Sequence, residues 1–144
     1  MWQIKKFSEL STKELFDILY LRTEVFVVDQ NRVYQEVDEH DLESVHIYDV
    51  VDDKIVAYAR VFPQNGNVTF GRVLTDPNYR SQGLGNQLMK QVLQVIHTEF
   101  PDKEIEIEAQ VQVEGFYKKF NFETHGEPFL FNHTPHLKMT HIAI

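Results

Sequence analysis

The order of apolar and polar residues along the chain predicts a mixture of strands and helices. Regular alternation at residues 2–6 and 104–111 is typical of half-buried strands. Together with several apolar runs, it predicts strands at residues 2–6, 45–51, 55–62, 68–75, 104–111 and 135–144, and another that begins at residue 122. Residues 126–134 are expected to form a loop between the last two strands.

Helical spacing of apolar residues predicts helices between these strands. Ser11 and Glu14 form a capping-box pattern that opens the first helix, and the apolar stripe of this helix also carries Arg22. Arg22 is therefore either an ion-paired arginine at the helix edge or a side chain that points into a site beyond the helix end. Residues 84–100 predict a long helix that covers a sheet, and residues 114–120 predict a short one.

The turns between the strands predict how the strands pair. Asp52-Asp53-Lys54 and Asn65-Gly66 are hairpin signals, so residues 45–75 are expected to form an antiparallel meander. The strand–helix–strand unit from 68 to 111 requires a right-handed crossover, which makes its two strands parallel. We therefore expect one α/β domain over residues 1–144, with a mixed, mostly antiparallel sheet and helices on both faces.

Composition and charge narrow the class of protein. The chain has 144 residues, a net charge of −8 and no cysteine, which excludes disulfides and thiolate metal sites. No apolar run reaches the roughly 20 residues of a membrane helix. The N-terminus lacks the apolar stretch of a signal peptide, so we expect a cytoplasmic protein. The acidic balance argues against nucleic acid and anionic membranes as partners, because both bind basic surfaces.

The segment from Asp76 to Asn86, here called the cradle, carries the most informative chemistry. Within it, Arg80, Gly83 and Gly85 are spaced R-x-x-G-x-G, directly between a predicted strand and a predicted helix. The first N–H groups of a helix have no intrahelical acceptor, and the helix dipole favours an anion there. Glycines let the backbone approach that anion closely. The cradle therefore predicts a pyrophosphate-binding turn.

The cradle also resembles a known family. Arg80-Ser81-Gln82-Gly83-Leu84-Gly85 is similar to the acyl-CoA-binding motif Q/R-x-x-G-x-G/A of the GNAT N-acetyltransferases. The stretch from Glu114 to Phe122, with its Phe116-Tyr117 pair, resembles the second signature of that family. Residues 21–22, 25–30, 34–38, 41–42 and 70–73 resemble the ElaA-like branch, so that the resemblance covers nearly the whole chain.

The resemblance implies a fold and a set of site residues. In this family the strands corresponding to 68–75 and 104–111 splay apart, and acetyl-CoA lies between them as co-substrate. Backbone groups of Val73, Leu74 and Thr75 would pair with the pantetheine arm, which an open strand edge is able to bind because pantetheine is an amide chain. The pyrophosphate would be held by Arg80, Ser81, Gln82, Gly83, Leu84, Gly85 and Asn86. Tyr117 would be the general acid for the CoA thiolate, and the Val73 N–H a donor to the oxyanion.

The general base and the acceptor amine stay open at this level. Thr69 stands where some relatives carry a glutamate, which leaves a water chain or the side chains of Glu108, Glu36, His40 and His46. The acidic segment 36–43 is either a solvated loop or the wall of a pocket for a cationic primary amine, in a small molecule or a peptide. On the second interpretation, the substrate-side residues are Arg22, Glu36, Asp38, Asp41 and Arg72. An ion pair between Arg72 and an acidic loop residue is the simpler expectation for that arginine.

Two other functions are alternatives. The missing strand glutamate favours a CoA-binding or CoA-sensing module without catalysis. His133 and His136 are a loose pair that a metal hydrolase would need, but no acidic residue adjoins them, and no metal is expected. The strand at 135–144 is expected at an exposed sheet edge, which is compatible with a monomer or a homodimer.

Overall fold

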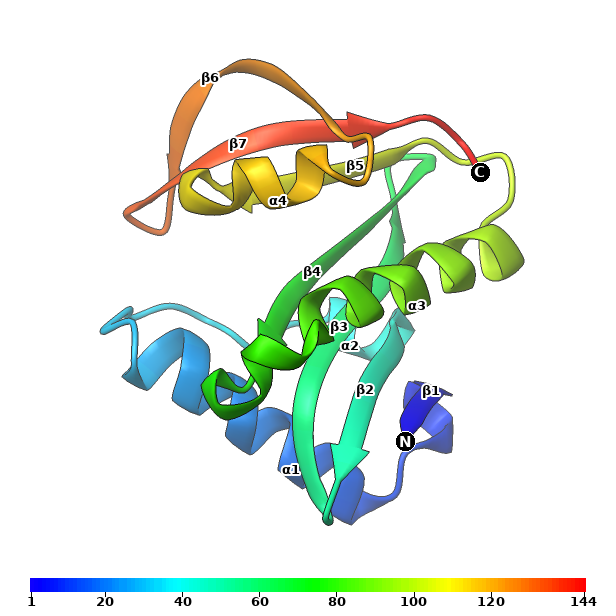
Figure 1. Cartoon of the computed structure of the whole chain (residues 1–144), viewed down its shortest axis with the longest axis vertical. Coiled ribbons are helices and arrows are strands. Elements are labelled where there is room, and N and C mark those ends of the chain that lie inside the picture. Colours follow the sequence, from blue (N-terminus) through cyan, green and yellow to red (C-terminus); the bar gives the residue numbers. More distant parts are fainter.

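The computed structural model describes the backbone of residues 1–144 and the side chains of all of them except Arg80, Ser81 and Gln82. The described chain forms a seven-stranded sheet in the order β1-β2-β3-β4-β5-β7-β6 (Figure 1). Its strands are β1 (Trp2–Lys6), β2 (Val45–Val51), β3 (Lys54–Gln64), β4 (Asn67–Thr75), β5 (Ile105–Gln110), β6 (Glu123–Phe131) and β7 (Thr134–His141). The β4–β5 pair is parallel and the other pairs are antiparallel, as the turn signals and the crossover predicted.

The helices are α1 (Thr12–Arg22), α2 (His40–Glu43), α3 (Leu84–Glu99) and α4 (Glu114–Lys118), and a π-helix (Thr23–Val28) continues α1. The predicted capping box opens α1: the Glu14 N–H donates to Ser11 Oγ at 3.0 Å, and the Ser11 N–H donates to Glu14 Oε1 at 2.8 Å. No helix of the described chain is long and apolar enough to cross a membrane.

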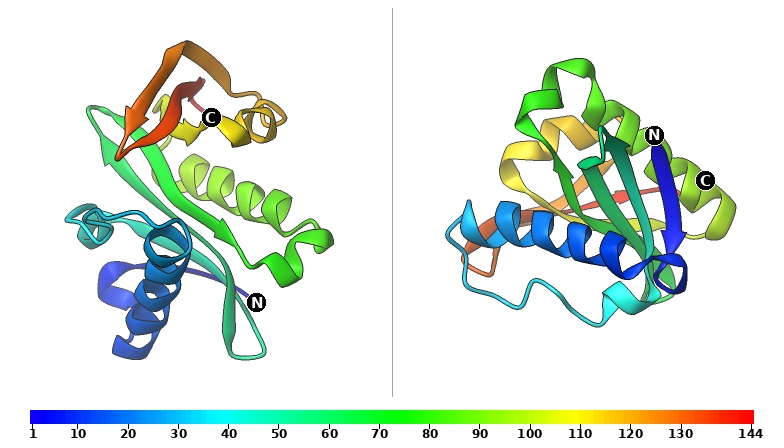
Figure 2. Two further views of the ribbon diagram at one scale, coloured as in Figure 1. Left: turned by 90° about the vertical axis from the view of Figure 1, so that its left-hand side faces the viewer. Right: turned by 90° about the horizontal axis from the view of Figure 1, so that it is seen from below.

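Helices cover both faces of the sheet, as expected (Figure 2). On one face, Leu88, Val92 and Ile96 of α3 are completely buried in a core that also contains the apolar side chains of β2 to β5 and β7. On the other face, Ile18 of α1 belongs to a second core with Tyr58 and other residues of β2, β3 and β4. We refer to these as the α3 face and the α1 face.

The sheet splits between β4 and β5. The two strands pair at a single position, Val68 with Ile105, and then diverge toward their C-terminal ends (Figure 1). The other edge of β4 pairs with β3 up to Thr75, but with a bulge, because Ala59 opposes both Arg72 and Val73. The predicted splaying of these two strands is therefore present.

The C-terminal hairpin differs from the sequence-based expectation in two ways. Residues 126–131 belong to β6 rather than to a loop, because the left-handed Gly126 (φ 78°) is accommodated in a bulge between His125 and Phe129. In addition, β7 lies between β5 and β6, so β6 rather than the terminal strand is the sheet edge. The expectation of an exposed edge at 135–144 was wrong.

Candidate functional site

The cradle leads directly from the end of β4 into α3. Asp76 caps a short 3-10 helix (Pro77–Gln82) by accepting the Asn78 N–H at 2.9 Å, and it pairs with Lys54 at 3.0 Å. Gly83 then adopts a left-handed conformation (φ 70°) that glycine tolerates at little cost. The first α-helical bond of α3 runs from the Gln87 N–H to Gly83 O, so the N–H groups before Gln87 have no intrahelical acceptor.

These features fit a pyrophosphate group. A sixteen-residue helix begins at Leu84, and its first N–H groups, which have no acceptor within the helix, and its dipole attract an anion. Of the residues predicted to bind the pyrophosphate, Gly83, Leu84, Gly85 and Asn86 are at this helix start. The side chains of Arg80, Ser81 and Gln82, which were predicted to share that role, lie outside the described residues.

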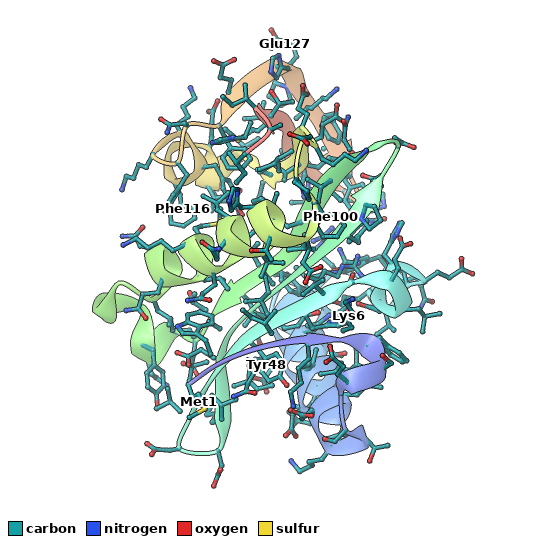
Figure 3. The ribbon with its side chains drawn as sticks, turned by 90° about the vertical axis from the view of Figure 1, so that its right-hand side faces the viewer. Met1, Lys6, Tyr48, Phe100, Phe116 and Glu127 are labelled. Atoms are coloured by element: carbon teal, nitrogen blue, oxygen red, sulfur yellow. The ribbon has the colours of Figure 1, made fainter. Side chains whose placement is uncertain are left out.

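The start of α3 is packed against α4. A Cβ atom on Gly85 would lie 3.5 Å from the Phe116 ring, an ordinary van der Waals distance, so Phe116 of α4 (labelled in Figure 3) lies close to the first turn of α3. The neighbouring residue on α4 is Tyr117. The cradle and the predicted general acid therefore come together at one end of the gap between β4 and β5.

Tyr117 is set in an aromatic cluster on the α3 face. Its ring centre lies 5.3 Å from that of Phe116 and 5.9 Å from those of Phe70 and Phe122, and the residue is 6% exposed. Burial raises the pKa of Tyr117 above its usual value. Its hydroxyl makes no hydrogen bond to any described residue, so the side chain is a protonated phenol with an unused donor.

The end of β4 presents an open backbone edge. Beyond Val68, no described residue of β5 pairs with it. The Leu74 side chain is buried in the α1-face core, and Val73 packs against the α3-face core. The side chains thus anchor the strand, whereas the backbone on the β5 side faces the gap, where an amide chain would add as a further strand.

Arg72 stabilises the bulge at this edge. It has a left-handed conformation (φ 52°), which costs a residue with a side chain about 1–2 kcal/mol. The Arg72 guanidinium donates to Glu36 Oε1 at 3.0 Å and to the Glu36 backbone oxygen at 2.8 Å. These charge-assisted hydrogen bonds tie the bulge to the segment between α1 and α2.

Glu36 belongs to a larger set of buried ion pairs, here called the arginine network, which consists of Arg22, Glu36, Asp38, Asp41, Arg60 and Arg72. The Arg22 side chain is completely buried and contacts Glu36 at 2.8 Å and Asp41 at 2.6 Å. Arg60 contacts Asp38 at 2.6 Å and Asp41 at 2.9 Å. The network connects α1, the segment before α2, α2 itself, β3 and β4.

The electrostatics of the network follow from these contacts. Burial acts to raise the pKa of Asp41, but the hydrogen bonds and charges of Arg22 and Arg60 outweigh it and lower that pKa to about 2. The pKa of Asp38 is lowered in the same way, mainly by Arg60 against the effect of burial. The carboxylates are therefore ionised and compensated at neutral pH.

This arrangement corrects the expectation of an acidic pocket wall. Glu36 and Asp41 are each 4% exposed and paired with arginines, and Arg22 is 0% exposed, so an acceptor amine does not reach them in this structure. Arg22 has the role of an ion-paired residue, and Arg72 pairs with an acidic residue as the simpler interpretation held. Asp38 is half-buried and bound to Arg60 and Arg72. Sequence reasoning missed Arg60, since it lies in an apolar strand with no motif to mark it.

The predicted general-base candidates differ in accessibility. His46 is completely buried, with Nε2 2.9 Å from the Asp41 backbone oxygen and Nδ1 2.7 Å from the Tyr58 hydroxyl. His40 pairs with Glu43 at 2.9 Å and stacks on Phe62. Glu108 is exposed on β5, and Thr69 is buried. His46 and Glu36 are therefore enclosed, and His40 and Glu108 face solvent.

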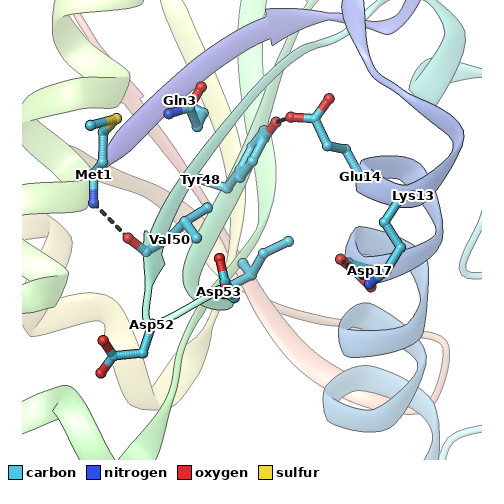
Figure 4. Close-up of a pocket in the computed structure, with 10 residues that line it drawn as sticks. Met1, Gln3, Lys13, Glu14, Asp17, Tyr48, Val50, Asp52 and Asp53 are labelled. Carbon is cyan, nitrogen blue, oxygen red and sulfur yellow. Dashed lines mark hydrogen bonds and ion pairs between the residues drawn. The ribbon is translucent and has the colours of Figure 1, made fainter.

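A cavity of about 690 Å³ lies elsewhere, between α1 and the β2–β3 hairpin (Figure 4). Two of its carboxylates already have partners: Glu14 accepts from Tyr48 and Lys5 at 2.6 Å, and Asp17 pairs with Lys13 at 2.7 Å. The side chains of Asp52 and Asp53 also line it. None of the sequence-predicted site residues lines it. Among the described residues, no group of three or more His, Asp or Glu side chains is arranged to hold a metal ion.

Comparison with known proteins shows the family of this chain. Residues 8–143 match the model of the acetyltransferase (GNAT) domain. A UPF0039 protein of Schizosaccharomyces pombe is 40% identical over 94% of this chain and 92% of its own. Protein ElaA of Escherichia coli is 36% identical over 99% of this chain and 97% of its own.

Solved structures agree in fold as well as in sequence. An acyl-CoA N-acyltransferase from Pseudomonas aeruginosa superposes with a TM-score of 0.92 at 36% identity, covering 97% of each chain. Escherichia coli ElaA gives a TM-score of 0.91 at 36% identity over the same shares. The GNAT fold implies an acyl-CoA as co-substrate, which fits the open β4 edge and the cradle. The chain therefore belongs to the GNAT acetyltransferase family, in the branch that contains ElaA.

Proposed function

We propose that residues 1–144 act as one N-acetyltransferase domain that moves the acetyl group of acetyl-CoA to a primary amine. Membership of the family supports acyl transfer; the choice of acetyl and amine is our proposal. The observation that carries it is the open edge of β4, which lies between an anion-binding helix start and a buried phenol with an unused donor. Pyrophosphate, amide arm and thiol of CoA each have a matching group along this path.

Direct attack in a ternary complex requires two groups beyond substrate binding. The Val73 N–H, beside the bulge, would donate to the carbonyl oxygen as negative charge develops there. Tyr117 would donate its proton to the leaving thiolate, and its raised pKa keeps it protonated at neutral pH. The Arg72–Glu36 contacts would hold the bulge, and thus the Val73 N–H, in place.

We further propose a cytoplasmic enzyme whose acceptor is a small-molecule or peptide amine. Compensation of Glu36 and Asp41 by arginines removes the main support for a cationic acceptor. An acceptor panel should therefore include neutral and anionic amines as well as polyamines, lysine peptides and protein N-termini.

The experiment has a binding arm and a turnover arm. Acetyl-CoA should raise the melting temperature of the protein in a saturable way, and thiol release should appear with at least one amine of the panel. Absence of both effects would refute the proposal.

A second candidate function, a CoA-binding module without catalysis, is favoured by one observation. Thr69, a buried threonine, stands where some relatives have a glutamate. Saturable acetyl-CoA binding without transfer to any amine of the panel would support this module instead.

A further inference from the structure

His136 is a buried histidine that the proposed mechanism does not yet use. It lies near the start of β7 and is 6% exposed. Its ring is 5.4 Å from the Phe131 ring in an edge-to-face contact and 6.2 Å from the Phe129 ring. The side chain is therefore held in one orientation by the aromatic residues of β6.

A backbone contact defines the protonation of the ring. His136 Nδ1 lies 2.7 Å from the Thr134 carbonyl oxygen. A carbonyl oxygen only accepts hydrogen bonds, so Nδ1 must carry the hydrogen and donate it. In the neutral ring, Nε2 then has a free lone pair, which is the state a proton acceptor needs.

Nε2 itself is unoccupied and reachable. Among the described residues, none makes a hydrogen bond to it. In the described chain, the fully buried side-chain nitrogen atoms without a partner are Arg32 Nε and Arg60 Nε. Because His136 Nε2 also has no partner but is not one of these atoms, it retains contact with solvent. The His136 ring is thus mostly buried, and Nε2 is the ring nitrogen in contact with solvent.

The alternation of β7 places His136 on the face opposite Tyr117. Leu137 and Met139 belong to the same core as Tyr117, on the α3 face. Successive side chains of a strand point to opposite faces, so His136 points to the α1 face. It lies directly opposite Gln110, the last residue of β5, at the C-terminal end of one of the two diverging strands.

A chain of contacts connects His136 with the bulge on the other diverging strand. The Arg72 guanidinium lies 5.5 Å from the centre of the Tyr34 ring, and the Arg32 guanidinium lies 4.5 Å from the same ring. Arg32 Nη2 donates to the Phe131 backbone oxygen at 3.4 Å, and Phe131 packs on His136. The segment after α1 and the tip of the β6–β7 hairpin thus lie side by side (Figure 2).

We propose that His136 Nε2 is the general base that takes a proton from the acceptor amine. This inference rests on the proposed function. The amine nitrogen forms a bond to the carbonyl carbon, and the carbon–sulfur bond breaks. His136 Nε2 takes one proton from the amine nitrogen, and Tyr117 gives one proton to the sulfur. The products are an amide and the free thiol of CoA, and both side chains then exchange protons with solvent.

The positions of the two side chains fit these roles. Acid and base lie on opposite faces of the part of the sheet that contains β5 and β7, on the β5 side of the gap between β4 and β5. A thioester in that gap would present its sulfur to one face and its carbonyl carbon to an amine that enters from the other. The Thr134 carbonyl oxygen accepts the Nδ1–H hydrogen bond and so fixes the orientation of the His136 ring. An efficient general base requires such an orienting group.

The first test compares His136→Ala with His133→Ala, a control on the same hairpin whose side chain is exposed. His136→Ala should lower kcat about 100-fold or more and leave acetyl-CoA affinity unchanged, and added imidazole should restore part of the rate. His133→Ala should behave as the wild type. An active wild type with a fully active His136→Ala variant would overturn the inference alone, whereas a wild type that acetylates no amine would overturn the proposed function.

The second test needs no turnover. In the ¹⁵N-labelled protein at neutral pH, the His136 ring nitrogens should report a protonated Nδ1 and an unprotonated Nε2. A ring protonated on Nε2 alone would overturn the inference, because that nitrogen would then have no lone pair to accept a proton. His136→Gln complements this measurement: it keeps the bulk of the ring partly in place, and it should lose turnover without loss of melting temperature.

Discussion

The two sides of the gap between β4 and β5 differ in the chemical groups that they contain. The CoA side, which comprises the end of β4, the start of α3 and Tyr117, offers backbone N–H groups, glycines and one phenol. The acceptor side is bordered by the arginine network, whose side chains bind one another. The proposed CoA site is thus local in sequence, whereas the proposed acceptor side depends on contacts between distant segments.

The difference concerns rigidity as well as composition. Buried charges are costly to desolvate, and they are tolerated here because each carboxylate has arginine partners. The network does not present open carboxylates to a ligand; it fixes the bulge at Arg72 and the segment before α2. Its main effect on function would be to position the Val73 N–H beside the gap.

Removing Arg22 is expected to have the largest effect, and it acts on the acceptor side. Arg22→Met leaves Glu36 and Asp41 without a main partner in a buried place, so the free energy of unfolding in urea should fall by about 3–5 kcal/mol. Lys13→Met is the matched control, because Lys13 pairs with Asp17 on the exposed surface, and it should change stability by less than about 0.5 kcal/mol. Equal effects of the two changes would contradict the structural role of the network.

Removing the Tyr117 hydroxyl tests the CoA side. Tyr117→Phe keeps the aromatic packing with Phe70 and Phe122 and deletes the donor to the thiolate. Turnover should fall about 100-fold, and the dissociation constant for CoA should stay the same. An acyl donor whose thiolate is a poorer leaving group should widen the difference in turnover between Tyr117→Phe and the wild type. An unchanged turnover would remove Tyr117 from the mechanism.

His46 is expected to make the unfolding free energy depend on pH. Burial lowers the pKa of His46, so the folded protein binds its proton less readily than the unfolded chain. Stability from this group is full above the unfolded pKa of about 6.5 and is lost as pH falls toward the lowered folded pKa, at up to about 1.4 kcal/mol per pH unit. His46→Gln should flatten this decline in the unfolding free energy. The exposed His97→Gln should retain it, and a decline of the same slope in all three proteins would exclude His46 as its source.

The smallest expected effect concerns the cradle. No atom lies within 4 Å of a Cβ placed on Gly83, so Gly83→Ala would be strained by its left-handed φ alone, at about 1–2 kcal/mol. CoA affinity should fall along with stability, because the start of α3 would shift. Gly115→Ala is the control: it lies in α4 without a positive φ, and it should be neutral or stabilising. Comparable losses of CoA affinity in both variants would argue against the cradle.

The same contrast explains what the sequence could predict. Gly83 and Gly85 after a predicted strand indicated the cradle, and Phe116-Tyr117 indicated the second signature of the family. Both could be predicted because they depend on neighbouring residues in the chain. The alternating strands and the α3 stripe were equally local. The sheet order of β7 and β6 was not, since two adjacent strands with similar patterns do not reveal which of them pairs with β5.

The network was harder to predict for the same reason. Arg22 and the acidic segment 36–43 stood out as candidates, but Arg22 pairs with residues that lie 14 and 19 positions further along the chain. The other two arginines of the network, Arg60 and Arg72, come from β3 and β4. Nothing in a single sequence distinguishes a carboxylate that faces a substrate from one that pairs with a buried arginine. His136 likewise gained a role only when Thr134, Phe131 and Gln110 were placed around it.

The central claim is that this chain transfers the acetyl group of acetyl-CoA to an amine. The most direct measurement incubates the wild-type protein with acetyl-CoA and the amine panel, and quantifies free thiol and N-acetylated amine in the same samples. We expect one molecule of N-acetylated amine for each thiol released, with at least one member of the panel. Saturable acetyl-CoA binding with thiol release that is independent of every amine, or with no thiol release at all, would contradict it.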